Sequence, residues 1–378
     1  MNEFSYAQQL PSGIRSRYVD NTNGLRMHVL EAGYESAGRP VALLLHGFPE
    51  LAWSWRHVML ELAHDGWHVL APDQRGYGAT SGWDDSYDGD LSKFRLLNLV
   101  RDTLGLVFAM DLKRVDVLMG HDFGAILAPW CVLARPDVFQ SVALMSAPFA
   151  GPPAIVPADD SPKKDIHAEL AALSRPRKHY HQYYSTRSAN ADMLHCSQGV
   201  HAFLRAYFHV KSADWDGNRP HRLEAWEADE LAKLPTYYVM DRDVNMAETV
   251  APQMPERDVI EACEWLSEAA LSVYSGAFAH TGFQGGLNWY RARASTQFEP
   301  ELQIFAGRTI DVPSVFIAGA SDWGAYQTPG ALERMRDTVC TNMSGCHLVD
   351  GAGHWVQQEQ PGAVVQLLRD FLSDLRIS

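Results

Sequence analysis

The sequence predicts an α/β fold in which a mostly parallel central sheet is flanked by helices and interrupted by an inserted helical cap. Two observations support this prediction. Short apolar runs such as residues 41–45 alternate with helical stretches, and a continuous apolar run is expected for a strand buried on both faces of a parallel sheet. The alternation is lost between about residues 150 and 305, which are rich in aromatic residues and helix formers, and it returns near the C-terminus.

The chain is long enough for one large domain that carries an insertion. It has 378 residues, of which 46% are hydrophobic and 21% are charged, a composition typical of a globular protein with a substantial core. We expect residues 1–149 and 306–378 to form the two parts of the α/β core, and residues 150–305 to form the helical cap.

The first two strands are expected on either side of Asn23-Gly24, because this dipeptide between two strand-like runs is a strong hairpin signal. Apolar and alternating runs predict the strands of the core at residues 15–19, 25–31, 41–45, 67–71, 114–119, 142–146, 315–318 and 347–349. Helices are expected at residues 93–110, from 123 onward, 223–234, 258–274 and 361–377. Ligands of such a sheet bind at the carboxyl ends of the strands, where the motifs described next are found.

Charge and composition exclude several classes of partner. The formal net charge is -14 and no basic stretch interrupts it, which argues against nucleic acid and anionic membranes. No run approaches the roughly 18 apolar residues of a membrane span, and the N-terminus does not read as a secretory signal. The five cysteines lack metal-ligand spacing, so we expect reduced thiols in a cytoplasmic protein and no metal site.

An aspartate stands at the centre of a glycine-flanked turn, Gly120-His121-Asp122-Phe123-Gly124, between a predicted strand and a predicted helix. The α/β-hydrolases present their nucleophile, usually serine, on such a turn. A carboxylate is ionised at neutral pH and is suited to displacement at an alkyl carbon, which leaves an ester on the enzyme. Asp122 therefore favours opening of epoxides or displacement of halide over acyl transfer.

A histidine and a second carboxylate follow in the chain order of this fold. His354 lies in the glycine-rich loop of residues 351–355, and Asp322 follows the strand predicted at residues 315–318. Such a carboxylate accepts a hydrogen bond from the imidazole, fixes its tautomer and stabilises its charged form. Asp350 is the second-ranked alternative for this acid.

The segment His46-Gly47-Phe48-Pro49 ends another predicted strand. We expect the backbone N–H groups of Phe48 and Phe123 to converge on an oxyanion, and the bond before Pro49 to be cis.

These motifs, together with two further segments, resemble the aspartate-nucleophile branch of the α/β-hydrolases, and most closely the soluble epoxide hydrolases. Residues 282–291 look like the family segment that ends in Asn-Trp-Tyr-Arg, whose tyrosine, here Tyr290, donates a hydrogen bond to the epoxide oxygen. The run at residues 180–184 is similar to the helix that supplies the partner tyrosine, a role we place on Tyr180. Tyr183 and Tyr184 share its helix face and stay as alternatives.

The resemblance implies hydrolysis of an epoxide to a vicinal diol, through an ester on Asp122 that water activated by His354 hydrolyses. It implies no cofactor, and its partners are a small apolar epoxide and water. The substrate pocket is expected to include Phe48, Pro49, Phe123 and Trp289. Aromatic residues of the cap point to an apolar, aryl-bearing substrate: Trp226, Phe208, Phe283 and Trp289. The choice between a monomer and a homodimer is left open.

Three alternative functions are set apart by particular residues. A haloalkane dehalogenase would use the same aspartate but needs side-chain N–H donors for the halide, which Phe48 and Phe123 lack. The fluoroacetate dehalogenases carry an arginine after the aspartate, where this chain has Phe123. A ligand-binding member of the fold without catalysis would have no use for Asp122, His354 and Asp322 together.

Overall fold

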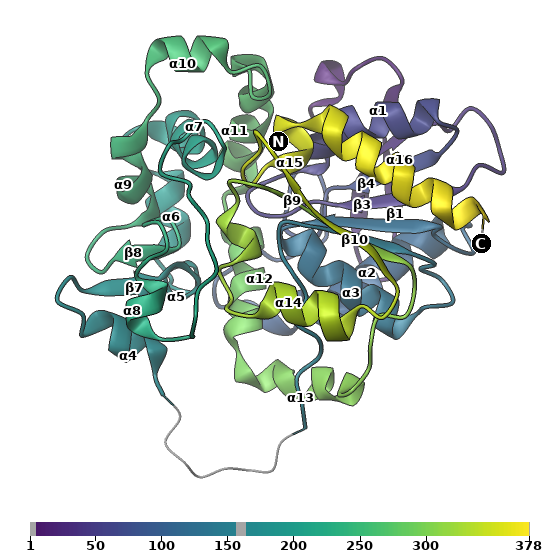
Figure 1. The fold of residues 1–378 in the computed structure, drawn as a ribbon. Helices are drawn as coiled ribbons and strands as arrows, with labels where there is room; N and C mark the ends of the chain where they lie inside the picture. The colour runs from purple at the N-terminus through teal and green to yellow at the C-terminus, as the bar shows by residue number, and fades with distance from the viewer. Residues whose placement is uncertain (1–4, 156–163, 378) are drawn as a thin grey trace.

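The computed structural model describes residues 5–155 and 164–377, and an eight-stranded sheet forms its centre (Figure 1). The strand order is β1-β2-β4-β3-β5-β6-β9-β10. The first two pairings, β1 with β2 and β2 with β4, are antiparallel, and all the others are parallel. The strands are β1 (Ile14–Asp20), β2 (Arg26–Ala32), β3 (Val41–Leu45), β4 (His68–Pro72), β5 (Val117–His121), β6 (Val142–Met145), β9 (Ser314–Gly319) and β10 (Met343–Val349).

The central strands are buried along their whole length, as their continuous apolar sequences predict. Every residue of β3, β5, β6 and β9 is buried. Helices α1 (Arg56–His64) and α16 (Pro361–Ile377) pack together on one side of the sheet, and α2 (Leu96–Ala109) and α3 (Phe123–Ala134) pack together on the other (Figure 1). The predicted α/β fold with a mostly parallel sheet is confirmed.

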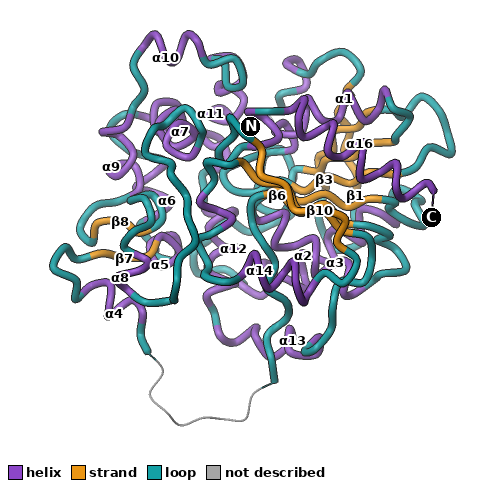
Figure 2. Tube along the Cα trace, viewed as in Figure 1, coloured by secondary structure: helices purple, strands orange, loops and turns teal. Residues whose placement is uncertain are grey.

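The chain between β6 and β9 is largely helical and lies beside the sheet rather than in it (Figures 1 and 2). It also contains a small antiparallel sheet of β7 (Arg177–His179) and β8 (Val239–Asp241), which the sequence did not predict because three residues are too few to show a period. Its helices are α4 (Ile166–Ala171), α5 (Tyr180–Tyr184), α6 (Ala189–Leu194), α7 (Gly199–Lys211), α8 (Ala228–Leu231), α9 (Met246–Val250), α10 (Arg257–Ala262), α11 (Glu268–Thr281), α12 (Gln284–Ala294) and α13 (Glu299–Leu302).

Two helices predicted in this segment are wrong in extent. Only α8 forms within residues 223–234, because Glu227 is extended at φ -134° and the Glu230 carboxylate, not a helix carbonyl, accepts the Glu224 N–H. Residues 258–274 are split into α10 and α11. Cys263 is extended, and the hydroxyl of Ser267 accepts the Ala270 N–H at 3.2 Å, which starts a new helix.

The fold brings six strand ends to one edge of the sheet. Because β4, β3, β5, β6, β9 and β10 run parallel, the loops that follow them lie at the same edge, and those after β4 and β3 closely approach α12. Helix α12 contacts both α5 and the short 3₁₀ helix Leu91–Phe94, so it joins the helical segment to the core. The predicted cis bond between Phe48 and Pro49 is present at this edge. Within the described residues, every helix is too short or too polar to span a bilayer.

Candidate active site

Asp122 occupies the sharp turn between β5 and α3. Its φ of 50° lies in the left-handed region that residues other than glycine rarely adopt, which holds the side chain out of both elements. The flanking glycines are required by close approach of the backbone. A Cβ on Gly120 would lie 2.2 Å from the Gly124 carbonyl oxygen, and one on Gly124 would lie 2.1 Å from the Leu45 carbonyl oxygen.

The carboxylate of Asp122 is buried and ionised. Its Oδ1 accepts the backbone N–H of Phe48 at 3.0 Å. Burial alone would raise the pKa of Asp122, but the adjacent His354, with the charges of Lys211 and His121, holds that pKa well below its ordinary value. Phe123 begins α3, and the first N–H groups of a helix have no partner within it.

His354 lies between two carboxylates, Asp122 and Asp322. Its Nε2 is 3.4 Å from Oδ2 of Asp122, and its Nδ1 is 3.1 Å from Oδ1 of Asp322. Asp322 is itself fixed, since its Oδ1 accepts the Gly324 N–H at 2.7 Å. The structure thus brings together the three residues that the sequence singled out. Asp350, the second-ranked acid, is exposed and is not among the partners of His354.

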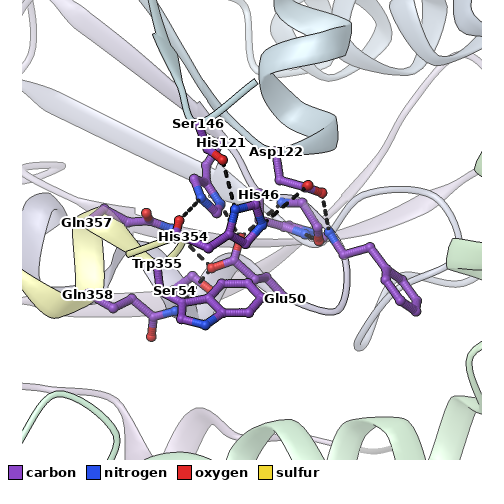
Figure 3. Close-up of polar contacts among 12 residues, drawn as sticks. His46, Glu50, Ser54, His121, Asp122, Ser146, His354, Trp355, Gln357 and Gln358 are labelled. Carbon is purple, nitrogen blue, oxygen red and sulfur yellow. Dashed lines mark hydrogen bonds and ion pairs between the residues drawn. The ribbon is translucent and has the colours of Figure 1, made fainter. Parts of the chain in front are cut away.

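Ser146 is a fourth member of this cluster that the sequence analysis missed. Its hydroxyl donates to Oδ2 of Asp322 at 2.5 Å. The same hydroxyl lies 2.8 Å from Nδ1 of His354 (Figure 3). Ser146 directly follows β6 and has a φ of 70°, another left-handed value. The available signal was its position, a hydroxyl at the carboxyl end of a buried strand.

A buried ion pair supports the loop that carries His354. Oε2 of Glu50 lies 2.5 Å from Nδ1 of His121, and Nε2 of His121 donates to the His354 carbonyl at 2.7 Å (Figure 3). The side-chain amides of Gln357 and Gln358 each donate to Oε1 of Glu50 at 3.0 Å. Burial opposes charge on His121, but Glu50 raises the pKa of His121 to about 9. The sequence analysis did not find this network, because its members come from three segments that lie far apart in the sequence.

Tyr180 and Tyr290 line the same cavity as Asp122, a space of about 50 Å³. The Tyr180 hydroxyl donates to Oε1 of Gln327 at 3.1 Å, and the two tyrosine rings lie 5.9 Å apart between centroids. Burial raises the pKa of both phenols, so both keep their protons at neutral pH. Each hydroxyl therefore carries a proton at the cavity, and that of Tyr180 is directed to Gln327 in this structure.

The two alternative tyrosines point elsewhere. The hydroxyl of Tyr183 donates to Asp192 at 3.1 Å, and that of Tyr184 donates to Tyr207 at 3.0 Å. Neither residue lines the cavity that holds Asp122.

The expected pocket residues are divided between the cavity and its surroundings. Phe123 lines the cavity with Asp122, and so does Trp226 of the helical segment. Trp289 instead lines an adjacent cavity of about 370 Å³, because its indole N–H is tied to the Arg75 carbonyl at 2.9 Å. Phe48 and Pro49 are buried, and the Phe48 ring packs edge-on against Tyr290 at 5.5 Å.

The two remaining aromatic residues proposed for the pocket are packing residues. Phe283 stacks on Phe278 at 4.6 Å, and Phe208 packs on Trp355 at 4.4 Å. Neither lines the cavity of Asp122.

The comparisons with known proteins agree on one family. Residues 40–361 match the family model described as the alpha/beta hydrolase fold. The chain is 36% identical over 367 residues to Epoxide hydrolase A of Mycobacterium tuberculosis (strain ATCC 25618 / H37Rv), covering 96% of this chain and 98% of the relative. It is 31% identical to an epoxide hydrolase of Caballeronia sordidicola, covering 93% of this chain and 92% of the relative.

A solved structure agrees. The epoxide hydrolase from an endophytic Streptomyces has a TM-score of 0.77 to this chain at 30% identity, covering 97% of this chain and 98% of the other. The chain therefore belongs to the α/β-hydrolase fold family and, within it, to the epoxide hydrolases.

Proposed function

We propose that this protein hydrolyses an epoxide to a vicinal diol through a covalent hydroxyalkyl ester on Asp122. One observation carries the proposal: the ionised carboxylate of Asp122 shares a cavity with the protonated hydroxyls of Tyr180 and Tyr290. A nucleophile for carbon and donors for a departing oxygen thus face the same space. The names of the similar proteins support the same reaction.

In the first step Asp122 attacks a ring carbon of the epoxide. Its Oδ1 is held by the Phe48 N–H, so Oδ2 is the oxygen that forms the new C–O bond. The bond between that carbon and the epoxide oxygen breaks, and its electron pair goes to the epoxide oxygen. Tyr180 and Tyr290 donate hydrogen bonds to that oxygen as its negative charge develops, which lowers the barrier.

In the second step His354 activates water. Its Nε2 is buried and has no hydrogen-bond partner within the described residues, and it faces the Asp122 carboxylate at 3.4 Å. It takes a proton from a water molecule that attacks the ester carbonyl carbon. The N–H groups of Phe48 and Phe123 stabilise the oxyanion, and Asp322 stabilises the imidazolium. The tetrahedral intermediate collapses and the bond between the carboxyl carbon and the substrate oxygen breaks. The two protons of the water, one of them returned by His354, end on the two diol oxygens, and Asp122 is restored as a carboxylate.

The contacts favour an epoxide over a haloalkane. The side chains of Phe48 and Phe123 carry no donor for a departing halide, and Trp289 already donates its indole N–H to Arg75. Turnover of styrene oxide and cyclohexene oxide to diols tests the assignment, with a panel of chloroalkanes and bromoalkanes as the comparison. If the haloalkanes release halide and none of the epoxides yields a diol, the assignment is contradicted.

We propose further that residues 150–305 act as a cap that completes the site, since they supply both Tyr180 and Tyr290 to a cavity whose nucleophile comes from the core. We also keep a cytoplasmic location as part of the proposal, because the five cysteines are free thiols.

A further inference from the structure

We propose that the active cavity takes an epoxide that carries a carboxylate, and that Arg293 binds this carboxylate. The inference rests on the proposed function and adds the chemical class of the substrate. It departs from the small apolar epoxide that the sequence analysis expected.

Arg293 lies on the cavity side of its helix. It belongs to α12, three residues after Tyr290, and residues at this spacing share a helix face. Both residues line the cavity that contains Asp122. Arg293 therefore follows, by about one helical turn, the tyrosine whose hydroxyl donates to the reacting oxygen in the proposed mechanism.

Arg293 also lines the larger neighbouring cavity of about 370 Å³. The two cavities share five lining residues: Phe123, Ile126, Pro148, Arg293 and Thr328. Four of these carry no charge. A substrate that extends from Asp122 into the larger cavity therefore passes Arg293, the one cation among these shared lining residues.

The charges of the small cavity favour an anion at Arg293. Its lining includes two ionised side chains, Asp122 and Arg293, and two histidines, His179 and His181. Burial lowers the pKa of His179 to about 3 and the pKa of His181 well below its ordinary value, so both imidazoles are neutral at pH 7. Arg293 is therefore the cation that a substrate meets in this lining.

The guanidinium of Arg293 is available for a ligand. In the part of the chain that the structure describes, it has no hydrogen-bond or ion-pair partner. The neighbouring Arg291 shows the contrast: it donates to the Tyr87 carbonyl and to Asn288, each at 2.8 Å, and lies over the Tyr87 ring. One arginine of the helix is thus used in packing, whereas the other faces the cavities.

Two acidic residues line the larger cavity, and neither of them pairs with Arg293. Glu301 is already paired with Arg95 at 2.9 Å. Glu299 is exposed and lies beyond ion-pair distance from Arg293. A planar carboxylate matches the fork of donors on a guanidinium and is held by two parallel hydrogen bonds.

The test compares epoxy acids with neutral partners of the same shape. Glycidate, 3,4-epoxybutanoate and 5,6-epoxyhexanoate are each paired with the corresponding primary amide, and kcat/KM is measured for both. The readout is the acid-to-amide ratio in R293Q divided by the ratio in the unsubstituted enzyme. This quotient cancels the intrinsic reactivity of each epoxide and the amount of active enzyme.

We expect the R293Q substitution to lower the acid-to-amide ratio about tenfold for at least one chain length, mainly through KM, as a charge-assisted hydrogen bond at a solvent-exposed group predicts. R293K should keep part of the preference. R308Q is the matched control, because Arg308 is exposed and lines neither cavity. A ratio that changes less than twofold in R293Q at all three lengths, or equally in R308Q, overturns the proposal.

The failure of this proposal is distinguishable from the failure of the proposed function. If the amides are hydrolysed and R293Q does not change the acid-to-amide ratio, the proposed epoxide hydrolysis is supported and the carboxylate site is contradicted. If no epoxide is hydrolysed, calorimetric binding of the dihydroxy acids and their amides still decides the site. Tighter binding of the acid that is lost in R293Q supports the site, and equal binding overturns it.

Discussion

The Nε2 atom of His354 lies 3.4 Å from Oδ2 of Asp122, and the imidazole is held there from its other nitrogen by Asp322 and Ser146. The same histidine thus faces the carboxylate that we propose as the site of the ester. This arrangement separates the two chemical steps. In the proposed mechanism Asp122 forms the ester without help from a base, and His354 is needed only for its hydrolysis.

Substitution of His354 by glutamine should therefore trap the intermediate. The alkyl-enzyme should accumulate to about one equivalent, and intact-protein mass spectrometry after a rapid quench should show the added mass of the epoxide. The control is D122A/H354Q, which lacks the attacking oxygen and should gain no mass. An adduct of equal yield on this double variant would place the ester on another residue.

The tyrosine pair should control ring opening. Replacing Tyr290 or Tyr180 by phenylalanine should slow formation of the ester, and loss of both hydroxyls should cost about 10²–10⁴-fold, the range of general acid catalysis. Rapid-quench kinetics measures this step directly. Tyr184 is the matched control, because its equally buried hydroxyl bonds Tyr207 outside the cavity. A Y184F variant as slow as Y180F would contradict the assignment.

Ser146 is predicted to be a positioning residue for the second step. S146A and S146G both remove the hydroxyl that contacts Asp322 and His354, and hydrolysis of the ester should slow by about tenfold in each, as loss of one hydrogen bond to a charged group predicts. Formation of the ester should change much less, because His354 does not act in that step.

The two Ser146 variants differ in stability, which separates structure from chemistry. The φ of 70° favours glycine, so S146G should unfold at a higher temperature than S146A. Both variants lack the hydroxyl, so both should hydrolyse the ester at a similarly reduced rate. If their rates instead differ in the order of their melting temperatures, the positioning role is wrong.

The Glu50–His121 pair should make stability depend on pH. In the folded state Glu50 raises the pKa of His121 to about 9, above its ordinary value of 6.5. This contribution is fully present below pH 6.5 and is lost as the pH rises from there through 9. Urea unfolding measured across this range should show stability falling with pH.

Removal of one partner of this pair should be costly. E50Q should lose about 3–5 kcal/mol of unfolding free energy, because it leaves a buried imidazolium without its counter-charge, and it should flatten the fall above pH 6.5. The exposed pair of Arg257 and Glu261 provides the control, and E261Q should cost less than about 1 kcal/mol. Equal losses in E50Q and E261Q would contradict the structural role of the buried pair.

The sequence predicted the core well because its signals are local. The run of five apolar residues in β3 and the glycines around Asp122 are each set by contacts within a few residues or by one close backbone approach. The helical segment was harder, since Glu230 satisfies the Glu224 N–H through a side chain and no period in the sequence reveals such a contact. Ser146 and Glu50 were missed because their partners are distant in the chain and meet only at the folded sheet edge.

The central claim is that Asp122 forms a covalent bond to substrate carbon, and a single turnover in oxygen-18 water tests it most directly. Enzyme in molar excess is mixed with epoxide in labelled water, and diol and protein are analysed after one turnover. The account predicts an unlabelled diol and one heavy oxygen in the Asp122 carboxylate, because the oxygen transferred to the diol comes from the enzyme. A diol that carries solvent oxygen from the first turnover, with an unlabelled Asp122, would contradict it.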